Sequence, residues 1–257
     1  MYVNTIILGA NPFFDAYTQS DVLGKLIFIG LYILSICSWI VLIHKIWLTY
    51  RAKKAAARFH EVFQLQKISP LSLDCETLNK RSDENPFLIL YNVFKKQTMD
   101  VLAKNRHFGY GQQETDKLHS SMHGHESGSL SLSDIDFIAS HLSTAIAGQI
   151  KHLEKNLYIL STTVSLAPFL GLLGTVWGIL MTFAVLQTKG SANSHQMILS
   201  GLSLALATTV LGLIDAIPAL VGYNYLKNSI REFATEMESF SNEILASVEL
   251  QYRKVDV

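Results

Sequence analysis

The chain has 257 residues, of which 49% are hydrophobic and 16% charged, and its mean hydropathy is +0.25. A soluble domain carries about 25% charged residues, so this composition is not that of an ordinary soluble globular protein. Acidic and basic residues balance at 21 each, which gives no reason to expect a nucleic-acid partner.

The first predicted element is a transmembrane helix over residues 23–47. Its apolar part, residues 26–43, holds no charge. At about 1.5 Å per residue it reaches roughly 27 Å, near the thickness of the hydrocarbon core. No Lys or Arg precedes Lys25, and no small-residue cleavage site follows the apolar run. We therefore expect residues 1–22 to be a retained periplasmic segment rather than a cleaved signal.

A cytoplasmic segment is expected over residues 48–134. Asn85-Pro86-Phe87 introduces a short helix through about Leu102, and the composition of residues 104–131 predicts a flexible loop. Three histidines of this loop have spacing that would suit a metal, but no Cys or acidic frame surrounds them, so we interpret the stretch as a polar loop. They are His119, His123 and His125.

The two cysteines are predicted to be free thiols. Cys37 falls in the first apolar segment and Cys75 in a polar stretch beyond it. A disulfide between them would have to cross the membrane boundary, which its short span does not allow.

Two further helices complete an all-α membrane protein. Apolar residues at helical spacing from Ile135 lead straight into the second span, which predicts one helix over residues 135–188 with a capping start at Ser133 and Asp136. After a loop at 189–195 comes the third span at 196–226, and a second apolar stripe predicts a cytoplasmic helix at 227–257. Spans two and three are thus both extended by cytoplasmic helices.

The basic residues that flank the spans predict the orientation. Lys and Arg cluster after the first span, before the second and after the third, whereas only Lys25 and Lys189 lie on the opposite side. We expect the N-terminus and the loop around Gly190 to lie outside, and the central segment and the C-terminus to lie in the cytoplasm.

Small and polar residues distinguish the second and third spans from the first. Pro168, Thr175 and Thr182 follow at intervals of seven, on nearly one helix face, and a matching stripe in the third span includes Thr208. A lone membrane Thr often bonds its own backbone, but two helices decorated together predict a shared polar path. The small residues permit close helix approach, and the candidates for helix packing are Pro168, Gly171, Gly174, Gly178, Gly201, Gly212 and Pro218.

Asp215 is the one acidic residue of the third span. A carboxylate at mid-membrane costs about 2.5–3.5 kcal/mol on insertion scales. Two roles are open for it: a place in the polar path, or a structural hydrogen bond near the cytoplasmic rim.

Two runs of sequence resemble the signatures of a known family. "APFLGLLGTVWG", from Ala167 to Gly178, and "GLSLALATTVLGLIDAIPALVGYN", from Gly201 to Asn224, are similar to spans two and three of the TolQ/ExbB/MotA family of proton-channel subunits. "SWIVLIHK", from Ser38 to Lys45, is more similar to the TolQ branch than to the ExbB branch. MotA stators, with four spans and a larger cytoplasmic domain, fit poorly.

The resemblance implies a pentameric ring in the bacterial inner membrane, with spans two and three lining a pore. It implies that Thr175 and Thr209 are the pore threonines. A TolR/ExbD-like single-span partner inside the pore would carry the proton on an aspartate. A TolA- or TonB-like protein would deliver the work across the periplasm, for Tol-Pal envelope integrity and cell division or for energised import.

One residue departs from the family pattern. Leu204 stands where the family usually has a glutamate, and Asp215 lies eleven residues further on, which is about three helical turns and about 20° around the helix. We hypothesise that Asp215 takes over part of the missing carboxylate's task. The predicted proton pathway is then Thr175, Thr209, Asp215 and Thr182.

The sequence also bears on two other classes of protein. A non-conducting scaffold of the same fold, which assembles partner helices without moving protons, is the alternative that Leu204 favours. An enzyme is not predicted, because no nucleophile–base set or metal cluster lies beside the spans, and no cofactor is expected.

Overall fold

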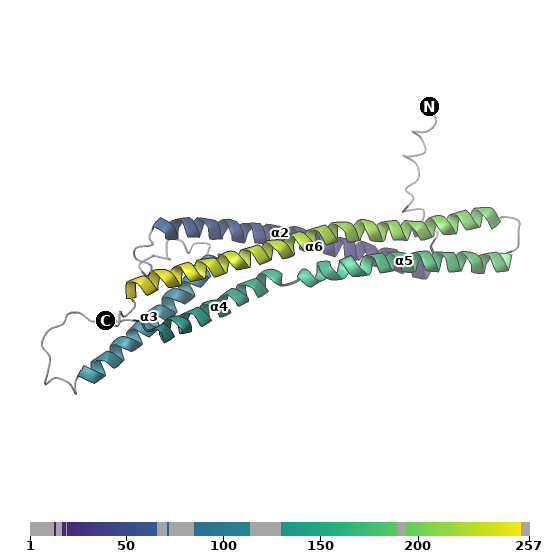
Figure 1. The fold of residues 1–257 in the computed structure, drawn as a ribbon. Coiled ribbons are helices and arrows are strands. Elements are labelled where there is room, and N and C mark those ends of the chain that lie inside the picture. The colour runs from purple at the N-terminus through teal and green to yellow at the C-terminus, as the bar shows by residue number, and fades with distance from the viewer. Residues whose placement is uncertain are drawn as a thin grey trace, which may run out of the picture. The chain divides into compact units, whose positions relative to one another are not determined.

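The computed structural model describes residues 13, 17–18, 20–65, 71, 85–113, 130–189 and 194–252, without the side chains of 107–113, 188, 189, 194–197, 200 and 204. Over this part of the chain the structure consists of five long helices (Figure 1). They are α2 (Val22–Leu65), α3 (Pro86–Gln113), α4 (Leu132–Glu154), α5 (Leu157–Lys189) and α6 (Ser194–Tyr252).

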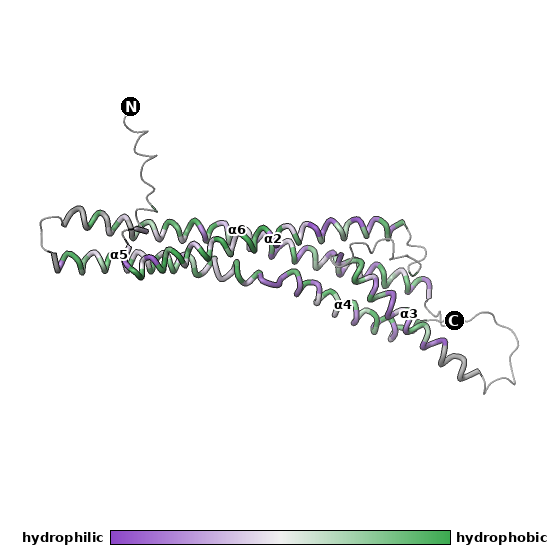
Figure 2. Tube along the Cα trace, turned by 180° about the vertical axis from the view of Figure 1, so that it is seen from behind, coloured by the Kyte–Doolittle hydropathy of each residue, from purple (hydrophilic) through white to green (hydrophobic). Residues whose placement is uncertain are grey.

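Three of these helices are long and apolar enough to cross a membrane. The membrane-length segments lie within Val22–Leu65, Leu157–Gln187 and Gly201–Tyr252. Figure 2 shows the hydrophobic residues concentrated along α5 and one half of α6, whereas hydrophobic and hydrophilic residues alternate in the other half of α6. The predicted all-α architecture with three spans is confirmed.

The helices form two compact units, and α2 and α6 contribute to both. The first unit comprises Met1–Ile46 and Lys155–Lys227, which contain the apolar segments, and the second comprises Trp47–Glu154 and Asn228–Val257.

The first unit packs around a small apolar core. Ile27 and Leu31 of α2, Ala167 of α5 and Ala216 of α6 are buried together. Alanine on two of the three helices lets their backbones approach closely. At the start of α2, the Asp21 carboxylate accepts a hydrogen bond of 3.0 Å from the Gly24 amide, which is N-cap geometry.

The second unit has an aromatic core. The ring of Phe87 stacks with Phe240 at 4.6 Å between centroids and with Phe233 at 5.9 Å, both nearly parallel. Phe63 meets Phe240 edge to face at 5.3 Å. Phe87 is placed by the start of α3, where its amide donates 3.2 Å to the Asn85 side-chain oxygen. Pro86, which lies between Asn85 and Phe87, is the first residue of α3 and so costs the helix no hydrogen bond.

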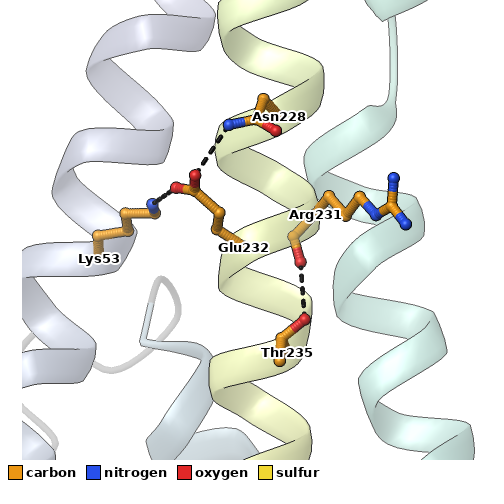
Figure 3. A network of polar contacts seen from close by, with 5 residues as sticks. All are labelled: Lys53, Asn228, Arg231, Glu232 and Thr235. Atoms are coloured by element: carbon orange, nitrogen blue, oxygen red, sulfur yellow. Dashed lines mark hydrogen bonds and ion pairs between the residues drawn. The ribbon is translucent and has the colours of Figure 1, made fainter.

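A polar contact lies on the surface of the same unit. Figure 3 shows Lys53 of α2 and Asn228 of α6 both pointing toward the Glu232 carboxylate, at 3.4 Å and 2.8 Å. Glu232 is more than half exposed, and exposed ion pairs contribute only about 0.2–1 kcal/mol. The Phe87 stack therefore stabilises the unit more than this contact does.

Helix α3 is longer than the sequence predicted. It continues to Gln113 rather than ending near Leu102, so residues 104–113 of the predicted 104–131 loop are helical. The glycines at 109 and 111 indicated a loop, but Gly lowers helix propensity by only about 1 kcal/mol, and neighbouring residues outweigh it. Cys75 and the three histidines of the predicted loop lie outside the described residues.

The start of α4 also differs from the prediction. Ser131, not Ser133, caps the helix: its hydroxyl accepts the Asp134 amide at 3.3 Å, and the Asp134 carboxylate accepts the Ser131 amide at 3.0 Å. This reciprocal pair is a capping box. Partial burial opposes the charge on Asp134, but the hydrogen bonds from Ser131 and Asn105 and the nearby Lys104 together hold the pKa of its carboxyl below the usual range.

The predicted single helix over 135–188 is wrong in one respect. The chain leaves the helix at Lys155 and Asn156 and begins α5 at Leu157, where Figure 1 shows the ribbon interrupted. Asn156 has a positive φ of 67°, a conformation that Asn tolerates better than most residues. An apolar stripe can continue across a break of this kind, and so its periodicity does not reveal it.

Candidate functional site

The contact between α5 and α6 is made by residues without bulk. A Cβ built on Gly171 would lie 3.0 Å from the backbone of Thr208, one built on Gly178 would lie 3.0 Å from the Ala205 side chain, and one built on Gly212 would lie 2.6 Å from the Ala167 carbonyl oxygen. Glycine at these positions therefore brings the two backbones into direct contact.

Hydroxyl groups line the same contact. Thr208 is 2% exposed, and its hydroxyl donates to the Ala205 carbonyl at 2.7 Å and lies 3.3 Å from the Gly171 carbonyl of α5. The neighbouring Thr209 donates to the same Gly171 carbonyl at 3.1 Å. Gly174 faces the Thr208 side chain. Two threonines of one helix thus converge on one carbonyl of the other.

Toward the Lys189 end of α5, Thr182 faces Gly201 of α6. Its hydroxyl donates a hydrogen bond of 2.7 Å to the Gly178 carbonyl of its own helix. The α5–α6 contact therefore carries side-chain hydroxyls at Thr182, Thr208 and Thr209.

Thr175 lies differently from these three. It is half-buried, and its hydroxyl donates 2.7 Å to the Leu172 carbonyl of its own helix. Of the two prolines predicted to help helix packing, Pro168 lies inside α5 and Pro218 inside α6, both half-buried.

Asp215 lies on a different flank of α6. It is 6% exposed, and its carboxylate accepts a hydrogen bond from Ser35 of α2. Its Oδ2 atom is buried and has no hydrogen-bond partner among the residues that the structure describes. The structure thus brings Thr182 and Thr209 to the α5–α6 contact and places Asp215 against α2.

Three contributors to these contacts were not among the predicted pathway residues. Thr208 belonged to the small-residue stripe, which was a usable signal. Ser35 is one of few polar residues in the first apolar segment, but nothing in the sequence pairs it with Asp215. Trp177 of α5 donates 2.9 Å from its indole N–H to the Asp21 carboxylate, a pairing between residues 156 positions apart that no local pattern reveals.

These residues offer no evident metal or cofactor site. Within the described ranges, no group of three His, Cys, Asp or Glu side chains is placed to hold a metal ion. Cys37 is a free, exposed thiol. The chemistry available between the helices is that of hydroxyl groups, backbone carbonyls and one carboxyl group.

Comparison with known proteins identifies the family. The model of the "MotA/TolQ/ExbB proton channel family" matches residues 112–239, which include all of α4 and α5 and every residue of the contacts just described except Asp21 and those of α2. The chain belongs to the MotA/TolQ/ExbB proton channel family. The prediction that it is not an enzyme is confirmed, because the members of this family are transport components.

Relatives come from both the ExbB and the TolQ branch. The biopolymer transport protein ExbB of Aquifex aeolicus is 48% identical over 99 residues, 38% of this chain and 66% of the relative. ExbB of Pseudomonas putida is 27% identical over 90% of this chain and 62% of the relative. The Tol-Pal system protein TolQ of Haemophilus influenzae is 26% identical over 90% of this chain and 91% of the relative. The chain therefore spans slightly less than two thirds of the two ExbB relatives.

The MotA/TolQ/ExbB match includes the α5–α6 contact, but it does not distinguish the TolQ branch from the ExbB branch. The predicted preference for the TolQ branch over the ExbB branch is not resolved by these relatives. The side chain of Leu204, the residue at the usual glutamate position, lies outside the described residues.

Proposed function

We propose that this chain is a proton-channel subunit of the inner membrane that works with a TolR/ExbD-like single-span partner. The observation that carries the proposal is the seam of hydroxyls between α5 and α6, at Thr182, Thr208 and Thr209, in a chain of the proton channel family. Hydroxyls both donate and accept hydrogen bonds, so they can hold pore water and solvate a transient charge.

The proposed assembly is a pentameric ring whose pore is lined by α5 and α6 and encloses the partner's helix. The partner supplies the carboxyl group that carries the proton. In the proposed topology the N-terminus is periplasmic, and the second unit and the C-terminus are cytoplasmic. The basic residues Arg51, Lys53 and Lys54, which follow the first apolar segment, support this orientation.

The proposed output is work done on the outer envelope through a TolA- or TonB-like protein. Between the two systems, we propose the Tol-Pal role in envelope integrity and cell division. The run from Ser38 to Lys45 resembles the TolQ branch, and TolQ of Haemophilus influenzae is 26% identical over 90% of this chain, which supports the Tol-Pal role. Complementation of strains lacking either protein, in bacteria that have both systems, separates this role from energised import.

Proton flux tests the channel proposal. The full chain and its partner are reconstituted in liposomes, and flux is followed with an enclosed pH-sensitive dye. Thr209→Val and Thr175→Val remove a hydroxyl at nearly constant shape, and each is expected to lower the flux about tenfold, which corresponds to about 1.4 kcal/mol in the barrier. Thr162→Val is the matched control, because Thr162 is exposed and its hydroxyl also bonds its own helix, at 2.8 Å.

A non-conducting scaffold is the second candidate. The hydroxyls of Thr175, Thr208 and Thr209 all donate to backbone carbonyls of this chain, an arrangement that also serves helix packing alone. If liposomes with chain and partner show no flux above empty liposomes while the ring assembles, the scaffold is correct. Asp215→Asn tests the hypothesis that Asp215 replaces the glutamate missing at Leu204. Full proton-driven function of this variant in cells would contradict that hypothesis.

A further inference from the structure

The buried carboxyl group of Asp215 is not accounted for by the α5–α6 contact. Its neighbour on α6 two turns away, Gly222, faces Leu42 of α2, and Asp215 itself bonds Ser35 of α2. This flank of α6 thus packs against the first span. By contrast, Thr208, Thr209 and Gly212 meet α5.

The carboxyl group has one partner where an ionised group needs several. Ser35 supplies one hydrogen bond, and because Oδ2 has no partner within the described part of the chain, Oδ1 is the acceptor. A carboxylate removed from water without a counter-charge or several donors is strongly disfavoured, and such a group takes up a proton instead.

No neighbouring charge offsets this cost. Along α2 the titratable side chains closest in sequence to Ser35 are Tyr32 and Cys37, and those closest to Ala167 on α5 and to Asp215 on α6 are Tyr158 and Tyr223. Among the described residues, Asp215 has no ionic partner, and Ser35 is its one hydrogen-bonding side chain. A metal cation is equally poorly served, because Ca²⁺ takes about six to eight oxygen ligands.

We propose that Asp215 and Ser35 form a proton-binding site between α6 and α2, which is occupied while the two helices are packed together. The reaction is the addition of a proton to the Asp215 carboxylate to give the neutral acid, and no other bond changes. Release of the proton requires water at Oδ2, so the site links protonation to the packing of the first span on the third. This goes beyond the proposed channel function, whose threonines lie on α5 and at its contact with α6.

Infrared difference spectroscopy on the full chain in lipid bilayers tests the site directly. The spectrum of the unmodified protein minus that of Asp215→Asn, at neutral pH, is expected to contain the carbonyl stretch of a neutral carboxylic acid. Heavy-isotope labelling of aspartate side-chain carboxyls shifts that band and excludes glutamate. If the difference contains only carboxylate stretches, Asp215 is ionised and the proposal is wrong.

A second pair of variants keeps the test decisive if Asp215→Asn does not fold. Ser35→Ala removes the donor to Oδ1 and is expected to shift the neutral-acid band. Ser38→Ala, a change at a buried serine of the same helix, is expected to leave it in place. Absence of any isotope-sensitive neutral-acid band in the unmodified protein overturns the proposal without any variant. The spectrum needs no proton flux, so a band without flux refutes only the channel proposal.

Discussion

Replacing Gly174 by alanine tests whether the α5–α6 contact is as close as the structure has it. A Cβ on Gly174 would lie 2.6 Å from the Thr208 Cβ, whereas ordinary contact begins at 3.4 Å. The helices would have to separate by 3.4 − 2.6 = 0.8 Å at this level. The same shift would lengthen the Thr208 and Thr209 bonds to Gly171 from 3.3 and 3.1 Å to about 4 Å, beyond hydrogen-bond range.

The expected loss of stability follows from these two effects. Overpacking costs typically 1–3 kcal/mol, and each interhelical hydrogen bond in a membrane contributes about 0.6 kcal/mol. Together they predict a loss of about 2–4 kcal/mol. Thr208 keeps its bond to Ala205 in either case, so that bond does not enter the sum.

The assay is the temperature at which half of the purified full chain leaves its monodisperse size-exclusion peak. At about 2–4 °C per kcal/mol, Gly174→Ala is expected to lower it by roughly 5–15 °C. Gly30→Ala is the matched control, because nothing lies within 4 Å of a Cβ placed there and alanine favours the helix. Thr208→Gly should partly rescue Gly174→Ala. Equal melting of Gly174→Ala and Gly30→Ala would refute the close contact.

Three other predictions use the same melting assay. Trp177→Phe removes the 2.9 Å hydrogen bond to the Asp21 carboxylate and should cost about 1.5–3 kcal/mol; an unchanged midpoint contradicts it. Asn156→Val, at φ 67°, should cost about 1–2 kcal/mol, whereas Asn156→Gly should be tolerated; equal effects would show that the turn has no left-handed residue. Asp134→Ala should destabilise the chain by about 1 kcal/mol, because it breaks the capping box. The pKa of the Asp134 carboxyl is lowered on folding, so its charge stabilises the folded chain above the unfolded value near 3.8. That contribution is lost as pH falls through the folded value. A stability difference between Asp134→Ala and the unmodified protein that stays constant into acid would contradict a contribution from this charge.

The spans and the small-residue contact were predictable because each depends on local composition or on helical spacing. Eighteen uncharged residues are long enough for a span whatever they pack against. Glycines at intervals of three and four, such as Gly171, Gly174 and Gly178, lie on one face by geometry alone. The first unit was therefore largely readable from the sequence.

The break at Asn156 and the partner of Asp215 were not predictable, for a common physical reason. Both depend on which elements meet across long stretches of sequence. Asn in the left-handed conformation costs little, so it leaves no strong signal. Ser35 and Asp215 are 180 residues apart, and the helical stripe that contains Asp215 gives its face on α6 but not the helix that covers that face.

The placement of Asp215 changes what the departure at Leu204 means. Helical spacing puts the two positions on one stripe of α6, about 20° apart, which is why Asp215 was expected to replace the missing acid. Three helical turns below, however, the same stripe meets Ser35 of α2. A carboxyl group there does not need to exchange protons with a partner in the pore in order to be useful. If it is neutral when α2 is packed and ionised when water enters, it makes the position of the first span depend on protons, while the conducting carboxyl belongs to the partner. The infrared spectrum and the flux measurement separate these two tasks, because the first reads Asp215 alone and the second reads the assembled pore.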